Sequence, residues 1–377
     1  GMDGFGYNFF SQKKALWASI GEAVERYSLH SFLPKEGEYI DSTFGQIRSE
    51  ALDIFAVAGI SPMQREIGDT RFLMKYGEDS IFRWVRGYSL TKRRKIFVPL
   101  QLVSFAYKNP YEKKEPLILS LVSTGAAAHH TFDEAILNGL LEVIQRDAFM
   151  ITWVNKLIPA SIDMESLPKE SEAKKISEIL NNIGLEPYLL HLPSDMPAHT
   201  VLCVILDRGG IGAAVTVGAG TDFDILRASA AALSEAYVTH YFVGRKLYNL
   251  KRNNESLSPD KNTLDREGRL VWWSATERLK DISFLLQGHK KMVSDFPRGN
   301  DFQKPKEAID FLVDYMSKKN LEVVYTSIFE EKLQEKFGLK SVMVTVPGMQ
   351  PLHLDEKLPY FYGRRLKEVP RVLDIET

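Results

Sequence analysis

The clearest periodic pattern of apolar residues lies between Ser123 and Asp147. After a loop of small residues, Thr131 and Glu134 have the spacing of a capping box, in which each side chain binds a free backbone amide at a helix start. The pattern therefore predicts a helix that begins near Phe132. Its apolar stripe is formed by Leu137, Leu140, Leu141 and Ile144, and a neighbouring polar stripe by Glu134, Asn138, Glu142 and Gln145.

An earlier segment, residues 13–30, has the same construction. Leu16, Ile20, Ala23, Val24 and Tyr27 fall on one predicted helix face, and Glu22, Glu25 and Arg26 fall on another. Carboxylates held on rigid helices suit a Mg²⁺–phosphate site, because Mg²⁺ takes oxygen ligands in a strict geometry. The alternative is that both polar faces are solvated surfaces with salt bridges, which contribute little.

The remaining pattern predicts further helices and a β-meander on a largely antiparallel sheet. Alternating residues indicate a β-hairpin at 82–105 and a series of strands at 187–192, 199–207 and 210–220. We expect a buried strand at 117–122 and a short helix at 49–57. A helix should end at Gly184, a long helix carrying Glu235 should follow Thr221 and Asp224, and another helix should lie near 305–318. The polar stretch 251–267 is predicted to be a flexible excursion.

Composition narrows the class of protein. The 377 residues are 44% hydrophobic and 26% charged, which is typical of a soluble globular protein. The net charge of −1 gives no reason to expect nucleic acid as a partner. No apolar run reaches the ~18 residues that span a membrane. Cys203 is the single cysteine and lies in an apolar run, so we expect no disulfide and a reducing, cytoplasmic location.

Four sequence segments, in this order, resemble the YcaO family, particularly its azoline-forming cyclodehydratases. They are GEAVERYS, WVRGYSL, the STG loop with LEVIQRDAF, and VPGMQPLHLDE with YGRRL. The resemblance runs from Gly4 to Leu366, and it implies a single YcaO-like domain over residues 2–377. It also implies an α/β (α+β) fold with mixed, largely antiparallel sheets flanked by helices. The likeness of the first two helices also suggests an internal duplication.

The resemblance implies ATP and Mg²⁺ as cofactors and assigns residues to them. Glu22, Glu25 and Arg26 match the family's first nucleotide helix; Glu134, Glu142 and Arg146 match the second, where Asn138 and Gln145 replace Gln and Glu. On the third helix only Glu235 matches, because Ala231, Val238 and His240 stand where the family has Arg, Gln and Arg. The implied metal ligands are Glu22, Glu25 and Glu142.

Other positions depart from the family's pattern. Phe5 replaces a lysine, whose charge Lys13 or Lys14 would have to supply, and Ala18 replaces a common serine. The pair His129 and His130 replaces small residues, and the last residues, VPRVLDIET, lack a proline-rich motif.

The sequence allows two interpretations each for a pair of histidines and for a pair of arginines. His129 and His130 could bind a metal with His353, although loop histidines without ligands are commoner. Arg364 and Arg365 could clamp a phosphate or form a plain surface pair.

The implied activity is ATP-dependent formation of azoline rings in a ribosomally made precursor peptide. A separate leader-recognising protein and a second copy of the chain are the expected partners, with no nucleic acid and no membrane. Two alternatives stay open: a catalytically impaired relative that binds peptide or regulates an enzyme, and a backbone thioamidation enzyme.

Overall fold

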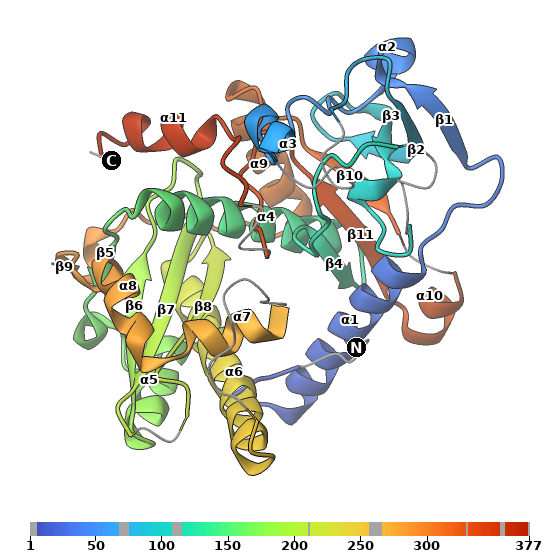
Figure 1. Ribbon diagram of the computed structural model, residues 1–377. Coiled ribbons are helices and arrows are strands. Elements are labelled where there is room, and N and C mark those ends of the chain that lie inside the picture. The colour runs from blue at the N-terminus through green and yellow to red at the C-terminus, as the bar shows by residue number, and fades with distance from the viewer. Residues whose placement is uncertain are drawn as a thin grey trace.

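In the computed structural model, the long central helix α4 (Phe132–Asn155) packs against strands of two separate β-sheets (Figure 1). The structure describes residues 6–67, 75–107, 115–209, 212–255, 266–328, 331–354 and 359–375. Among these residues, no helix is both long enough and apolar enough to cross a membrane.

The first sheet has six strands, and its neighbouring strands pair in antiparallel fashion. Their order is β1-β2-β10-β11-β4, with β3 paired to β2 as the predicted hairpin. The strands are β1 (Tyr39–Thr43), β2 (Ile81–Ser89), β3 (Arg94–Pro99), β4 (Ala126–His129), β10 (Val324–Ser327) and β11 (Lys340–Thr345). One hydrophobic cluster, which includes Trp84 and Phe82, fills the space beside β2 and β3.

The second sheet has five strands in the order β8-β7-β6-β5-β9, and the predicted series of antiparallel strands is confirmed in β6, β7 and β8. The short edge pair of β5 and β9 is parallel. The strands are β5 (Ala160–Ile162), β6 (Leu185–His191), β7 (His199–Asp207), β8 (Val215–Asp222) and β9 (Lys290–Lys291). Cys203 lies fully buried in the middle of β7, as its apolar surroundings predict.

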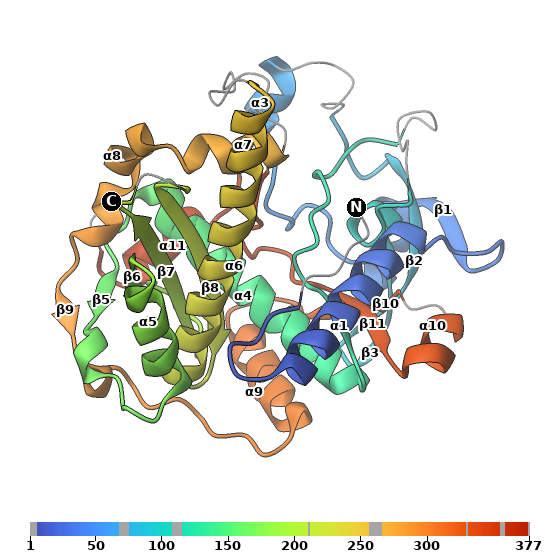
Figure 2. The same ribbon diagram turned by 90° about the horizontal axis from the view of Figure 1, so that it is seen from below.

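Helices cover both sheets, which confirms the predicted fold class. α5 and α6 pack on the second sheet, and α9 packs against α4. Figure 2 shows the segment before α1 passing beside α6, where the rings of Phe9 and Tyr237 lie 5.3 Å apart. The other helices are α1 (Gln12–Ser31), α2 (Phe44–Ile47), α3 (Pro62–Ile67), α5 (Glu172–Asn182), α6 (Ile225–Arg252), α7 (Arg266–Trp273), α8 (Leu279–Ile282), α9 (Pro305–Lys318), α10 (Glu331–Phe337) and α11 (Arg365–Val372).

The starts of the three long helices are fixed by local side-chain caps. Thr131 and Glu134 form the predicted capping box at the start of α4. The Ser11 hydroxyl accepts from a backbone amide at the start of α1, and the Asp224 carboxylate does so at the start of α6. Each cap therefore fixes where its helix begins relative to the sheets.

Several predicted elements are wrong. Residues 117–122 are largely buried but form no strand, and the strand in this region is β4, inside the expected loop 123–130. The sequence 49–57 forms no α-helix. On α1, Leu16 and Tyr27 are exposed rather than packed. The expected excursion 251–267 stays a prediction, because residues 256–265 lie outside the described residues; only its first two residues, in α6, and its last two, in α7, are helical.

Candidate active site

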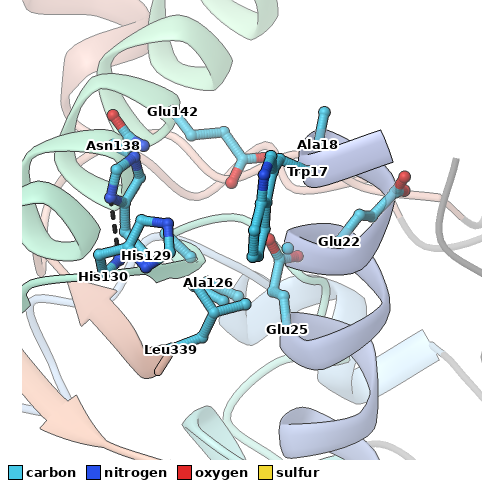
Figure 3. A pocket seen from close by; sticks show the side chains of 13 residues that line it. Trp17, Ala18, Glu22, Glu25, Ala126, His129, His130, Asn138, Glu142 and Leu339 are labelled. Atoms are coloured by element: carbon cyan, nitrogen blue, oxygen red, sulfur yellow. Dashed lines mark hydrogen bonds between the residues drawn. The ribbon is translucent and has the colours of Figure 1, made fainter. Parts of the chain in front are cut away.

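A cavity of about 480 Å³ lies between α1 and α4, with β4 along one wall (Figure 3). Its volume is within the range of small-molecule sites. The lining residues are Trp17, Ala18, Gly21, Glu22, Glu25, Ala126, Ala127, Ala128, His129, His130, Asn138, Glu142 and Leu339. The cavity thus joins the two helices that the sequence singles out.

Packing of α1 on β4 brings the acidic face of α1 to the cavity. Gly21 lies against β4, where a Cβ built on it would make an ordinary van der Waals contact with the carbonyl oxygen of Ala128 at 3.7 Å. One helical turn further on, Glu25 faces the cavity. Glu22 also lines it and is held by an ion pair with Arg26 on its own helix.

Across the cavity, α4 contributes a carboxylate that a backbone amide holds in place. The Glu142 carboxylate accepts a hydrogen bond from the Gly125 N–H at 3.0 Å, and Arg146 lies 3.5 Å from its other oxygen. Arg146 also approaches Glu235 of α6 at 3.9 Å. The Arg146 guanidinium therefore links the second and third long helices, although both of its contacts are long.

The local arrangement around Glu142 is repeated around Glu235. Glu235 accepts a hydrogen bond from the Ala219 N–H of β8 at 3.0 Å, just as Glu142 accepts from Gly125 beside β4. In both cases the glutamate lies eleven residues after the N-cap residue, Thr131 or Asp224. Glu22 lies equally far after Ser11 in α1. The three long helices thus carry a glutamate at the same distance from their caps.

The carboxylates around the cavity are electrostatically crowded. Burial raises the pKa of Glu25 well above its usual value; the nearby charges of Glu142 and Glu22 add to this shift, and Arg26 opposes it. Burial also raises the pKa of Glu142, with Arg146 and the Gly125 N–H opposing and Glu235 adding to the shift. A bound cation would relieve this repulsion, so the donor set fits a hard oxygen-seeking ion such as Mg²⁺.

The sequence-predicted residues do not all face the cavity. Asn138 lines it, but Gln145 is buried within α4. The Glu134 carboxylate is used by the capping box and by His129, whose Nδ1 lies 2.7 Å away. Burial alone would raise the pKa of Glu134, but its contacts with Thr131 and His129 outweigh burial and lower that pKa. Among the described residues, no three His, Cys, Asp or Glu side chains are grouped to hold a metal ion by themselves.

Two interpretations that the sequence left open, a histidine metal site and a role for Arg365 at the surface, are wrong. His353 does not join His129 and His130, since it is buried against Tyr360 rather than lining the cavity. Arg365 is neither a surface residue nor a free phosphate clamp, because its buried guanidinium pairs with Asp147 and Asp195 at 2.6 Å each. The burial of Arg365 could not be seen in the dipeptide alone.

Residues that the sequence did not single out also lie at the cavity. Trp17 and Leu339 line it. Tyr7 lies near Glu235 and Glu22, and burial together with these two charges raises the pKa of its hydroxyl. The position of Trp17 four residues before Gly21 on one helix face was the available signal for its place in the cavity.

Solved structures of other proteins share this fold. A heterocyclase in complex with substrate and cofactor superposes with a TM-score of 0.75 and 22% identity, covering 98% of this chain and 47% of that one. YcaO from Methanopyrus kandleri, bound with AMPPCP and Mg²⁺, gives a TM-score of 0.62 and 20% identity, covering 92% and 78%. This chain therefore spans about half the length of the heterocyclase.

Comparison of the amino-acid sequence agrees with the comparison of structures. An uncharacterised protein encoded in the tfuA 3′ region of Rhizobium leguminosarum bv. trifolii is 23% identical over 278 residues, which are 71% of this chain and 60% of that protein. The model of the family described as YcaO cyclodehydratase, ATP- and Mg²⁺-binding, matches residues 9–350. This match covers most of the chain, which therefore belongs to the YcaO family.

Proposed function

We propose that the cavity between α1 and α4 binds ATP with Mg²⁺ and that the chain uses them to form azoline rings in a ribosomally made peptide. The observation that carries this proposal is that Glu22 and Glu25 of α1 and Glu142 of α4 line one cavity. Burial and neighbouring carboxylates raise the pKa of Glu25 and of Glu142, which is the electrostatic environment that a cation would stabilise. The family description, with its ATP and Mg²⁺, supports the same occupant.

In this proposal the residues divide into two groups. Glu22, Glu25 and Glu142 hold Mg²⁺ together with oxygens of the triphosphate, because the three carboxylates surround the cavity without forming a complete metal site alone. Of the remaining family positions, Arg26, Asn138, Arg146 and Glu235 would surround the nucleotide. Glu134 instead caps α4, and Gln145 is buried within that helix.

Arg146 is the best-placed cation for a phosphate. Its Nε is buried without a hydrogen-bond partner, and its contacts to Glu142 and Glu235 are 3.5 and 3.9 Å long. A phosphate oxygen would satisfy this donor and retain the guanidinium between the two helices. Arg146 would thus neutralise charge that develops on the transferred group.

The implied chemistry places modest demands on the protein. A Ser, Thr or Cys side chain of the peptide attacks the preceding carbonyl carbon, and its proton is lost to solvent or a base. The former carbonyl oxygen takes the γ-phosphoryl group of ATP, which leaves as ADP. Phosphate then departs and the amide N–H loses its proton as the ring's C=N bond forms. The chain's own residues would position the reactants and screen charge. The structure of a heterocyclase that shares the fold was solved in complex with substrate and cofactor, which is consistent with this proposal.

A catalytically impaired relative is the second candidate. Val238 and Ala231 on α6 provide no polar group where the family has Gln and Arg, and buried Gln145 brings no charge. Such a chain would bind peptide or regulate a partner. Thioamidation of the backbone is a third use of the same nucleotide site. In each case we propose a separate leader-recognising partner and a homodimer.

Calorimetric titration with ATP and Mg²⁺ tests the nucleotide site. We expect micromolar binding by the wild-type chain and at least a 10-fold loss in a Glu142→Gln variant, because a metal ligand loses its charge. Glu165→Gln is the matched control, since the Glu165 side chain is 86% exposed and remote from the lining residues. No heat from wild-type protein at millimolar ATP would favour the impaired relative.

A further inference from the structure

Trp17 is a large apolar side chain that stands open at the cavity. Its side chain is 43% exposed although it lines the cavity wall. In Figure 3 the indole extends from α1 past Glu25 and toward Glu142. Leaving so much aromatic surface in water has an unfavourable hydration free energy, which a stacked ligand would remove.

The imidazole ring of His130 packs against the indole of Trp17. The two rings meet in a T-shaped contact with centroids 5.4 Å apart and planes at 68°. His130 is itself placed by the start of α4, since it directly follows His129, whose Nδ1 lies 2.7 Å from the Glu134 carboxylate of the capping box. The aromatic wall is therefore attached to both helices that form the cavity.

The same cavity therefore offers an aromatic side chain and carboxylates. On α1, Trp17 lies five residues before Glu22 and eight residues before Glu25, which is roughly 8 and 12 Å along the helix axis at 1.5 Å per residue. A ligand that carries both a flat ring and phosphates matches these two kinds of side chain. Leu339 adds further apolar surface to the wall.

We propose that Trp17, supported by His130, is the stacking surface for the nucleotide base, so that the site recognises ATP through its purine as well as its triphosphate. This inference rests on the proposed function. It assigns to Trp17 a role in specificity, because stacking depends on the size of the base, and purines stack more extensively than pyrimidines.

Two probes, ATP with Mg²⁺ and inorganic tripolyphosphate with Mg²⁺, separate the base from the phosphates. We expect Trp17→Ala to weaken ATP binding by about 10-fold or more, in line with alanine substitutions of base-stacking aromatics, and to leave tripolyphosphate binding within about twofold. Trp17→Phe should restore most of the ATP affinity. Wild-type protein should bind ATP more tightly than UTP, and Trp17→Ala should reduce that preference.

Leu16→Ala is the matched control, because Leu16 is the preceding residue on α1, is 60% exposed and does not line the cavity. It should bind both probes like the wild-type chain. Equal losses for ATP and tripolyphosphate in Trp17→Ala, or no loss for either, would overturn the stacking role while ATP binding itself stands. If the wild-type chain bound tripolyphosphate but not ATP, the base site would be disproved. Binding of neither probe by wild-type protein would instead overturn the proposed function.

Discussion

Glu25 illustrates how a single residue of this site opposes folding. Its carboxylate is partly buried on α1, with the charges of Glu142 and Glu22 close enough to raise its pKa further. At neutral pH the folded chain must hold these negative charges together, whereas the unfolded chain separates them. Without a bound cation, the arrangement therefore lowers the free energy of unfolding.

We predict that Glu25→Gln raises the free energy of unfolding at pH 7 by roughly 1 kcal/mol while abolishing Mg²⁺–ATP binding. Because the pKa of Glu25 is raised in the folded state, its proton stabilises the fold below the unfolded pKa of about 4.3, and this contribution is lost as pH rises through the folded pKa. The gain from Gln should accordingly disappear near pH 4. Urea denaturation at both pH values measures it.

Glu165→Gln serves as the control, since the exposed Glu165 carboxylate forms a surface ion pair with Lys174 and its replacement should leave the stability nearly unchanged. A Glu25→Gln variant that is less stable than the wild-type chain at pH 7 would contradict the account of carboxylate crowding.

At the level of elements, β4 and α4 approach each other through two glycines. Gly125 has φ +90°, and a Cβ there would meet the Val344 carbonyl oxygen at 2.1 Å. A Cβ on Gly139 of α4 would meet the Gly125 carbonyl oxygen at 2.5 Å. This close packing holds the Gly125 N–H where it donates to Glu142.

We predict that Gly139→Ala destabilises the protein by about 1–3 kcal/mol, the reverse of the effect that Ala normally has within a helix. The added methyl group must displace backbone rather than a flexible side chain. Gly244→Ala in α6 is the matched control, because nothing lies within 4 Å of its Cβ position, and it should stabilise by about 0.5–1 kcal/mol. Thermal unfolding of both variants measures the difference, and equal shifts of the two would refute the packing argument.

The sequence predicts well those elements that local chemistry determines. The capping box places the start of α4 at Phe132, and the pattern at 305–318 matches α9. It does not predict β4, because Ala126–His129 has no β-branched residue and exists through pairing with β11. At 117–122, apolar residues indicate burial, but only a partner strand makes such a run a strand. Convergence of Glu25 and Glu142 likewise depends on how α1 docks, which no local pattern contains.

At the scale of the whole molecule, a buried ion pair attaches the C-terminal helix to the centre of the fold. Arg365 of α11 donates to Asp147 of α4 and to Asp195 of the loop after β6, and all three side chains are nearly inaccessible to solvent. Asp147 also accepts from the Gln350 N–H at 2.7 Å. Asp147 directly follows Arg146, which contacts Glu142 of the cavity, so this network and the cavity lie on successive turns of α4.

We predict that Arg365→Met lowers the free energy of unfolding by about 3–5 kcal/mol, because the fully buried Asp147 would lose its counter-charge. Asp195 would keep its ion pair with Lys319, whose Nζ lies 2.9 Å away. The double variant Asp147→Leu with Arg365→Met should recover much of the loss, since no unpaired carboxylate then remains at position 147.

Arg364→Met is the control. The Arg364 side chain is 49% exposed and pairs with Glu368 at 3.6 Å, so less than about 1 kcal/mol should be lost. Urea denaturation of the three variants measures these free energies of unfolding. Equal losses of this free energy in Arg364→Met and Arg365→Met would show that burial of the ion pair contributes nothing to stability.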